Sequence, residues 1–301
     1  MGLSYPCAVA SVYITAVGCL TPQGQGLETL RGETPLPRRT APERLEGRVV
    51  AGLPDAGWID PIPRPERWHG RRVRFGRLDR LTKLAMVAAH HAVDAASLPG
   101  DRERAGVAFG TAFGSHLANE GFQLQLEQRP AEEVSPSLFT YTLPSAAVGE
   151  ISIHLGLRGP TVTLTEGIGA GAAAVALAAR LVARGEASWM LAGAADVLGP
   201  TLLAASGPRA PTMSEGSVFL VLSNESRGAL ARVAETAEGA GERRLSYDAD
   251  GEHPWERELG RCGAAAPLLG LCRLLGSGSL PVSLAVRDGV GSSSVLHLDA
   301  P

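Results

Sequence analysis

Glycines gather in the segment Gly167-Ile168-Gly169-Ala170-Gly171, which follows a strand-like run at 161–165 and opens a helix-like run. The backbone N–H groups of such a turn could cradle a pyrophosphate. In dinucleotide-binding folds, however, the ribose-binding acid ends the next strand, whereas Glu186 here precedes that strand and Asp196 comes late. We therefore favour the interpretation that these small residues let the start of the helix pack closely in a buried layer. A nicotinamide-dependent oxidoreductase is a distant alternative.

Glu166 is the carboxylate best placed for chemistry, because it lies between a strand and a helix, where catalytic groups are commonly presented. A buried or interface-paired glutamate is the plainer interpretation. The seven histidines are isolated or, at His90-His91, adjacent, so no metal-ligand spacing occurs. The serines at 277 and 279 lack the G-x-S-x-G pattern and a preceding strand. We expect neither a metal site nor a serine nucleophile.

Composition excludes several classes of function. The 301 residues include 28 basic and 31 acidic side chains, a formal charge of −3, so nucleic acid is not an expected partner. The most apolar stretch, 170–183, contains Arg180 and is too short to span a bilayer, so no membrane association is expected. Four cysteines without CxxC spacing are typical of reduced thiols in a cytoplasmic protein.

Strand and helix patterns alternate along the chain, which predicts an α/β fold. A Pro- and Arg-rich stretch at 34–76 is expected to be a long irregular excursion, and Asp79 is expected to cap the helix that follows it. The expected strands are 12–17, 106–110, 161–165, 189–193 and 217–222, and the expected helices are 79–98, 145–155 and 169–184.

An internal similarity indicates a duplication. Residues 171–185 can be laid on residues 264–278 without a gap, and each segment is followed by a strand. Chance similarity between two Ala-rich helices is the alternative. We expect a single domain over 1–301 with two pseudo-repeats, roughly 10–225 and 226–301, of which the second is truncated.

The region around the glycine turn resembles the nucleophile region of β-ketoacyl synthases of the thiolase fold. The matching residues are Leu155-Gly-Leu-Arg-Gly-Pro160, the segment from Thr161 through the turn to Gly185, and Trp189-Met-Leu-Ala-Gly-Ala-Ala-Asp196. Residues 213–222 resemble the family's G-E-G-A-G strand, and most of the first 225 residues are covered. The resemblance implies a layered α-β-α-β-α domain with a shortened second half.

The departures from that family concern its catalytic groups. The position of the cysteine nucleophile falls on Ile168, which cannot form a thioester. The two histidine motifs are replaced around residues 247–251 and by Gly260-Arg-Cys-Gly-Ala-Ala-Ala266, and the G-F-G-G motif is degraded at 288–292. The comparison therefore implies no catalytic residue in this chain.

A ketosynthase-like chain without catalytic groups resembles a chain-length factor, the inert subunit of a type II polyketide synthase. This resemblance implies a heterodimer with a ketosynthase and substrates carried on the phosphopantetheine of an acyl carrier protein, with no cofactor held by this chain. Ile168 would suit a reduced acyl chain, which points to a polyene-forming system. The alternative on the same fold is a thioester decarboxylase or hydrolase that uses Glu166.

The same resemblance implies two groups of functional residues. The acyl tunnel at the subunit interface, whose size sets product length, would be lined by Phe113, Leu138, Phe139, Thr140 and Ile168. The dimer seam would run along 135–149 and the strand 161–165, with Val162, Leu164 and Glu166 at the interface.

Overall fold

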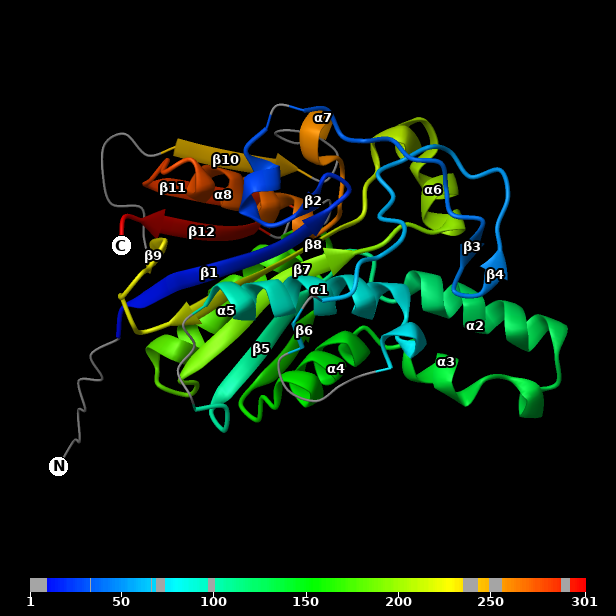
Figure 1. Ribbon diagram of the computed structural model, residues 1–301, viewed down its shortest axis with the longest axis horizontal. Helices are drawn as coiled ribbons and strands as arrows, with labels where there is room; N and C mark the ends of the chain where they lie inside the picture. Colours follow the sequence, from blue (N-terminus) through cyan, green and yellow to red (C-terminus); the bar gives the residue numbers. More distant parts are fainter. Residues whose placement is uncertain are drawn as a thin grey trace.

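A computed structural model describes the chain over residues 10–32, 34–65, 67–68, 74–96, 101–234, 243–248, 256–287 and 293–301. A ten-stranded mixed sheet runs through the molecule, with helices on its faces (Figure 1). Within the described residues, every helix is too short or too polar to cross a membrane.

The first half of the sheet has the strand order β1-β8-β7-β5-β6. Strands β5 and β6 are parallel, as are β5 and β7, whereas β8 runs antiparallel to both β7 and β1. The bounds are β1 (Val12–Thr21), β5 (Ala105–Gly110), β6 (Thr161–Leu164), β7 (Trp189–Asp196) and β8 (Gly216–Ser223), with the two-residue β2 (Gly24–Gln25) against β1.

The second half repeats this arrangement with the order β10-β11-β12-β9, and β9 pairs with β1 to join the halves. The pair β10–β11 is parallel, and the pairs β11–β12 and β12–β9 are antiparallel. The first half has the same directions, because β5–β7 is parallel and β7–β8 and β8–β1 are antiparallel. The expected duplication with a shortened second half is therefore confirmed. The bounds are β9 (Ala231–Ala234), β10 (Arg243–Asp248), β11 (Val282–Arg287) and β12 (Ser293–Asp299).

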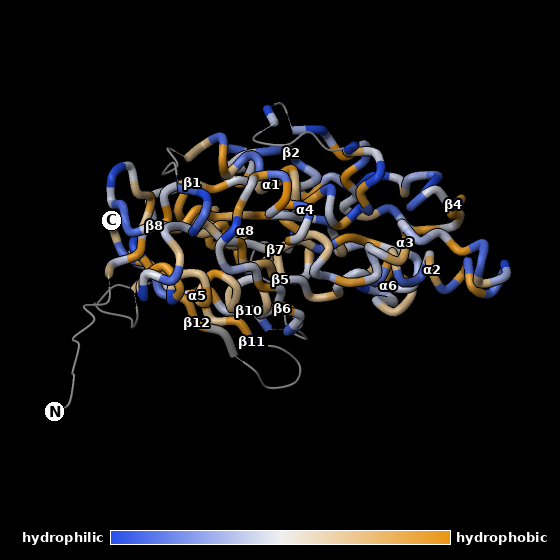
Figure 2. Tube along the Cα trace, turned by 90° about the horizontal axis from the view of Figure 1, so that it is seen from below, coloured by the Kyte–Doolittle hydropathy of each residue, from blue (hydrophilic) through white to orange (hydrophobic). Residues whose placement is uncertain are grey.

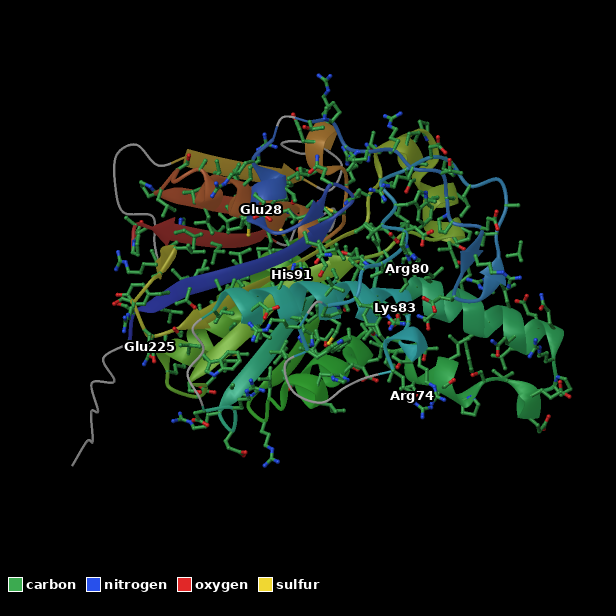
Figure 3. The ribbon with its side chains drawn as sticks, in the orientation of Figure 1. Glu28, Arg74, Arg80, Lys83, His91 and Glu225 are labelled. Atoms are coloured by element: carbon green, nitrogen blue, oxygen red, sulfur yellow. The ribbon has the colours of Figure 1, made fainter. Side chains whose placement is uncertain are left out.

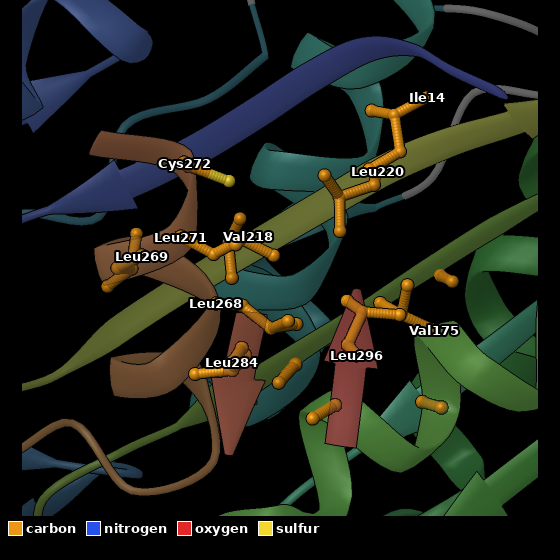
Figure 4. Packing of buried hydrophobic residues seen from close by; sticks show 14 of the residues in the cluster. Ile14, Val175, Val218, Leu220, Leu268, Leu269, Leu271, Cys272, Leu284 and Leu296 are labelled. Atoms are coloured by element: carbon orange, nitrogen blue, oxygen red, sulfur yellow. The ribbon is translucent and has the colours of Figure 1, made fainter. Parts of the chain in front are cut away.

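Helices α5 (Ala170–Ala183) and α8 (Ala265–Gly276) lie between the two halves of the sheet. Each precedes the corresponding strand of its half, β7 or β11. Figure 4 shows Leu268 of α8 between Val218 of β8 and Leu284 of β11. Figure 2 shows that most residues of α5 have hydrophobic colours. A Cβ atom on Gly171 would lie 2.4 Å from the carbonyl oxygen of Ala264, so the glycine turn serves close helix packing, as the sequence analysis favoured.

The opposite face of the first half is covered by α1 (Arg80–Ala95) and α4 (Ser145–Leu155). Asp79 caps α1 by accepting a hydrogen bond from the Thr82 N–H at 3.1 Å, as expected. All the expected strands and helices are present. The other elements are β3 (Arg44–Leu45) and β4 (Arg48–Val49) inside the long excursion, and α2 (His116–Gln128), α3 (Pro136–Thr140), α6 (Pro200–Ser206) and α7 (Glu256–Leu259).

The second half of the sheet is largely exposed on one face. Leu284 and Val286 of β11 face α8, whereas Ala285 and Arg287 between and beyond them are exposed. Val295 of β12 is also exposed, while Leu296 is buried. This alternation is typical of an antiparallel sheet with one solvated face, so the shortened half needs helices on its inner side alone.

A buried ion pair joins the excursion, helix α1 and the start of strand β8. Arg80 donates to both oxygens of Glu215, from Nε at 2.6 Å and from Nη2 at 2.7 Å. Glu215 also accepts from the backbone N–H groups of Ile59 and Leu198, at 2.8 and 3.3 Å. Burial acts to lower the pKa of Arg80, but Glu215 outweighs it, so the pKa lies above its ordinary value and the guanidinium keeps its charge. Figure 3 shows Arg80 at the N-terminal end of α1.

Replacing Glu215 with glutamine should destabilise the fold strongly, because the buried Arg80 charge would lose its counter-charge. We expect Glu215→Gln to lower the free energy of unfolding by about 3–5 kcal/mol in urea denaturation. The control is Glu103→Gln, which removes a pair with Arg158 whose side chains are 70% and 71% exposed, and which should cost about 1 kcal/mol or less. Equal losses in the two variants would contradict a structural role for the buried pair.

Candidate functional site

Ile168 lies in the 3₁₀ turn Gly167–Gly169 that connects β6 to α5, where it is buried at one wall of a cavity of about 460 Å³. Phe113, in the corner that follows β5, forms another part of the wall. The structure thus brings together two residues that the sequence analysis placed in one tunnel. The remaining lining residues are Leu202, Ala205, Ser206, Pro208, Arg209, Met213, Arg261 and Gly263.

Two connections complete this cavity. Helix α6 and the turn after it supply residues 202–213, and the segment between α7 and α8 supplies Arg261 and Gly263. A short parallel bridge between Met213 and Arg261 holds the two connections side by side. Most of the lining is apolar, and Arg209 and Arg261 are its charged members.

The carboxylate of Asp196, at the end of β7, ties the cavity walls together. It accepts hydrogen bonds from the Thr111 hydroxyl at 2.7 Å and from the N–H groups of Ala112 and Phe113, each at 3.0 Å. It also accepts from the Ala264 N–H at 2.7 Å, just before α8. Asp196 therefore fixes the corner that carries Phe113 relative to the second pseudo-repeat.

The contact between Asp196 and the segment before α8 requires a glycine at position 263. Its φ is +53°, and a Cβ atom at this position would lie 2.3 Å from Oδ2 of Asp196. Any side chain would therefore push the segment before α8 away from Asp196. Burial raises the pKa of Asp196 to about 6, against the hydrogen bonds that lower it, so the group is mainly ionised at pH 7.

The cavity wall offers no activated nucleophile among the described residues. Ile168 occupies the expected thiol position, and the hydroxyl of Ser206 donates to the Leu202 carbonyl of its own helix at 2.8 Å. Cys262 lies nearby but is fully buried; burial and, less strongly, the Asp196 charge raise the pKa of its thiol far above the ordinary value. A protonated buried thiol is inert, so Cys262 does not substitute for the missing cysteine.

The other expected tunnel residues lie elsewhere in this chain. Leu138, Phe139 and Thr140 belong to α3, outside the residues that line the cavity. Phe139 is 58% exposed and packs against Phe122 of α2, with ring centroids 5.4 Å apart. Their expected contact with a tunnel needs a second subunit and stays a prediction.

The expected interface residues lie along one sheet edge. Val162 and Leu164 are half-buried on β6, the end strand of the sheet. Glu166 is exposed beyond this strand and does not line the cavity. The degraded motif at 288–292 lies outside the described residues, as do 249–251 of the first histidine motif.

Sequence reasoning missed the outer wall of the cavity, formed by Leu202, Arg209 and Met213. The run 200–213 shows neither a long amphipathic pattern nor a reactive group, so it carries no signal of a site. Arg261 was visible as part of a replaced histidine motif, but its position beside residues 209–213 depends on the tertiary fold.

Replacing Asp196 with asparagine should remove a pH dependence of stability. The folded-state pKa of about 6 exceeds the roughly 3.9 of an unfolded aspartate. The stability that follows from this raised pKa is therefore fully present below about pH 4 and is lost as the pH rises to about 6. We expect the free energy of unfolding of wild type minus that of Asp196→Asn to fall over this range, measured by denaturant titration at pH 4, 5 and 6. A difference that rises with pH would contradict the assignment.

Comparison with known proteins identifies the family of this chain. The model of the β-ketoacyl synthase N-terminal domain matches residues 10–218. The 3-oxoacyl-[acyl-carrier-protein] synthase 2 of Staphylococcus aureus (strain COL) is 29% identical over 199 residues, which are 62% of this chain and 45% of that enzyme. The chloroplastic synthase I of Arabidopsis thaliana is 30% identical over 162 residues, 52% of this chain and 32% of the plant enzyme. The chain thus spans less than half the length of these relatives.

Solved structures share the fold along nearly the whole chain. The ishigamide ketosynthase/chain length factor superposes with a TM-score of 0.78 at 20% identity, covering 96% of this chain and 99% of that one. A β-ketoacyl synthase from Burkholderia phymatum STM815 gives a TM-score of 0.72 at 16% identity, covering 97% and 100%. With a thiolase-like fold and a family match over most of its length, this chain belongs to the β-ketoacyl synthase family.

Proposed function

We propose that this chain is a non-catalytic, chain-length-factor-type subunit that pairs with a ketosynthase and shapes the space available to a growing acyl chain. The observation that carries the proposal is Ile168, an inert side chain at the family's thiol position in the wall of an apolar cavity. Without a thiol, no acyl thioester can form on this chain at that position. The fold similarity to a ketosynthase/chain length factor supports the same role.

The acyl substrate would be delivered by an acyl carrier protein, whose phosphopantetheine would be bound mainly by the ketosynthase. A solved neighbour, with a TM-score of 0.71 at 18% identity, is a type II polyketide synthase acyl-carrier protein in complex with its ketosynthase bound to the hexaketide. In this proposal the chain holds no cofactor of its own. A decarboxylase or hydrolase based on Glu166 has less support, because that carboxylate is exposed and lies outside the cavity lining.

The distribution of exposed apolar side chains supports a subunit interface at the β6 edge. Leu143, which precedes α4, is 59% exposed, Ile153 on α4 is 61% exposed, and Phe139 on the neighbouring α3 is also exposed. Helix α4 contacts β6, so Ile153 lies on a helix that packs against an edge strand, and Phe139 and Leu143 precede this helix along the chain. A partner that continues the sheet there would bury this surface.

Truncating Phe113 should lengthen the product. The ring occupies part of the cavity wall, so Phe113→Ala would add space for several carbons of an acyl chain. We would reconstitute the chain with its ketosynthase, reductive enzymes and acyl carrier protein, and compare product lengths by mass spectrometry. Wild-type chain should carry no acyl adduct in intact-mass spectra of the same mixture.

The matched control is Phe75→Ala, which removes a phenyl ring from the turn before α1, outside the cavity lining. It should leave the product distribution unchanged. An unchanged distribution for Phe113→Ala in a complex that assembles and turns over would reject a gating role. An acyl adduct on the wild-type chain would reject the non-catalytic assignment.

A charge at the β6 edge should dissociate the heterodimer. Ile153→Asp and Val162→Asp place a carboxylate in the surface that we assign to the partner, where desolvation without a counter-charge is costly. We expect gel filtration to show separate subunits while the ketosynthase stays folded. Val295→Asp, at a 49% exposed valine on β12, should leave the complex intact. If all three complexes co-elute, the seam lies elsewhere.

A further inference from the structure

We propose that the β3–β4 hairpin is a pH-dependent clamp on the N-terminus of α1, closed while Asp79 is neutral and loosened when Asp79 and Glu46 are both ionised. Glu46 and Gly47 form the turn of this hairpin, and Asp79 is the residue before α1. The proposal concerns this chain alone and does not require a ketosynthase partner.

Two carboxylates meet the first turn of α1. Oε1 of Glu46 accepts a hydrogen bond from the Arg80 N–H at 2.5 Å, and Oδ1 of Asp79 accepts one from the Thr82 N–H at 3.1 Å. One carboxylate is favourable at a helix N-terminus, because the first N–H groups have no partner within the helix. A second charge on the same turn repels the first, most strongly where water is excluded. Asp79 is 6% exposed, so it is the group that keeps its proton.

The pKa of Asp79 agrees with this arrangement. Burial raises it to about 7, the charge of Glu46 raises it as well, and hydrogen bonds and the Lys83 ammonium act to lower it. The other cation at this helix end, the Arg80 guanidinium, is engaged by Glu215. Asp79 therefore loses its proton near neutral pH, and the second negative charge appears at the helix end in that range.

The groups on the side of α3 and α4 do not neutralise that charge. Tyr141, which follows α3, donates to Oε1 of Glu150 on α4 at 3.2 Å. Burial and then Glu150 raise the pKa of Tyr141 far above its ordinary value, so it remains a neutral phenol. His154 lies 3.8 Å from the other oxygen of Glu150. A phenol and a further carboxylate supply no counter-charge to Asp79.

The hairpin turn is built so that loss of the Glu46 contact releases it. Glu46 has a φ of +49°, a left-handed conformation that is uncommon for a residue with a side chain. The hydrogen bond from the Arg80 N–H compensates for this cost while the clamp is closed. In the same hairpin, Arg48 lies 3.8 Å from Glu120 of α2, and Figure 1 shows the hairpin beside α2. The clamp thus connects the start of α1 with α2.

The test is hydrogen exchange of the Arg80 amide in the full chain at pH 6, 7 and 8, corrected for intrinsic exchange rates. We expect the protection factor in the wild type to fall at least about tenfold over this range. Asp79→Asn should keep its protection at pH 8, because no second charge forms. Constant protection in the wild type, or an equal fall in Asp79→Asn, would overturn the proposal.

Glu46→Gln keeps the test decisive if Asp79→Asn fails to fold. It retains an acceptor for the Arg80 N–H without the charge, so its protection factor should not depend on pH, and the titration midpoint of the Asp79 carboxyl carbon in NMR spectra should fall. The matched control is Glu43→Gln, which removes the same charge from an exposed glutamate just before the hairpin and should behave as the wild type does. If Glu46→Gln and Glu43→Gln give the same pH profile, the proposal is wrong.

Discussion

The four hydrogen bonds accepted by the Asp196 carboxylate connect parts of the chain that no local pattern would bring together. They join the end of β7, the corner at 111–113 and the segment that opens α8, and so they cross between the two pseudo-repeats. Because the carboxylate is buried, removing one of these donors would cost a charge-assisted hydrogen bond in a place where water does not replace it. The positions of Phe113 and Gly263 in the cavity wall both follow from this contact.

The shortened second half can still be stable because it keeps the strand order of the first half and one helix that covers the inner face of these strands. Its four strands keep the order and pairing directions of their counterparts, and α8 covers the inner face as α5 does for the first half. Where exposed residues alternate with buried ones on β11 and β12, the outer face can meet water directly. The retained strands and α8 are the part of the second repeat that packs around the two central helices, α5 and α8.

The turn between β6 and α5 keeps its place in the fold, whereas the residue at its centre is not a nucleophile. The turn before α5 still presents residue 168 to a cavity, but the residue is isoleucine, and the nearby Cys262 is a buried thiol. The Arg80–Glu215 pair and the Asp196 contacts keep the surrounding loops in place. The family fold is therefore retained around a cavity whose described lining residues include no thiol that an acyl group could modify.

The sequence by itself determined the elements and their family relationship. The Asp79 cap, the strand and helix periodicities, the repeat of 171–185 at 264–278 and the isoleucine at the thiol position are local patterns, and short-range backbone preferences make such patterns readable. The outer part of the cavity wall was decided by the tertiary structure. Arg209 and Arg261 belong to segments about fifty residues apart whose approach depends on an isolated β-bridge and on backbone hydrogen bonds. No periodicity along the chain encodes that approach.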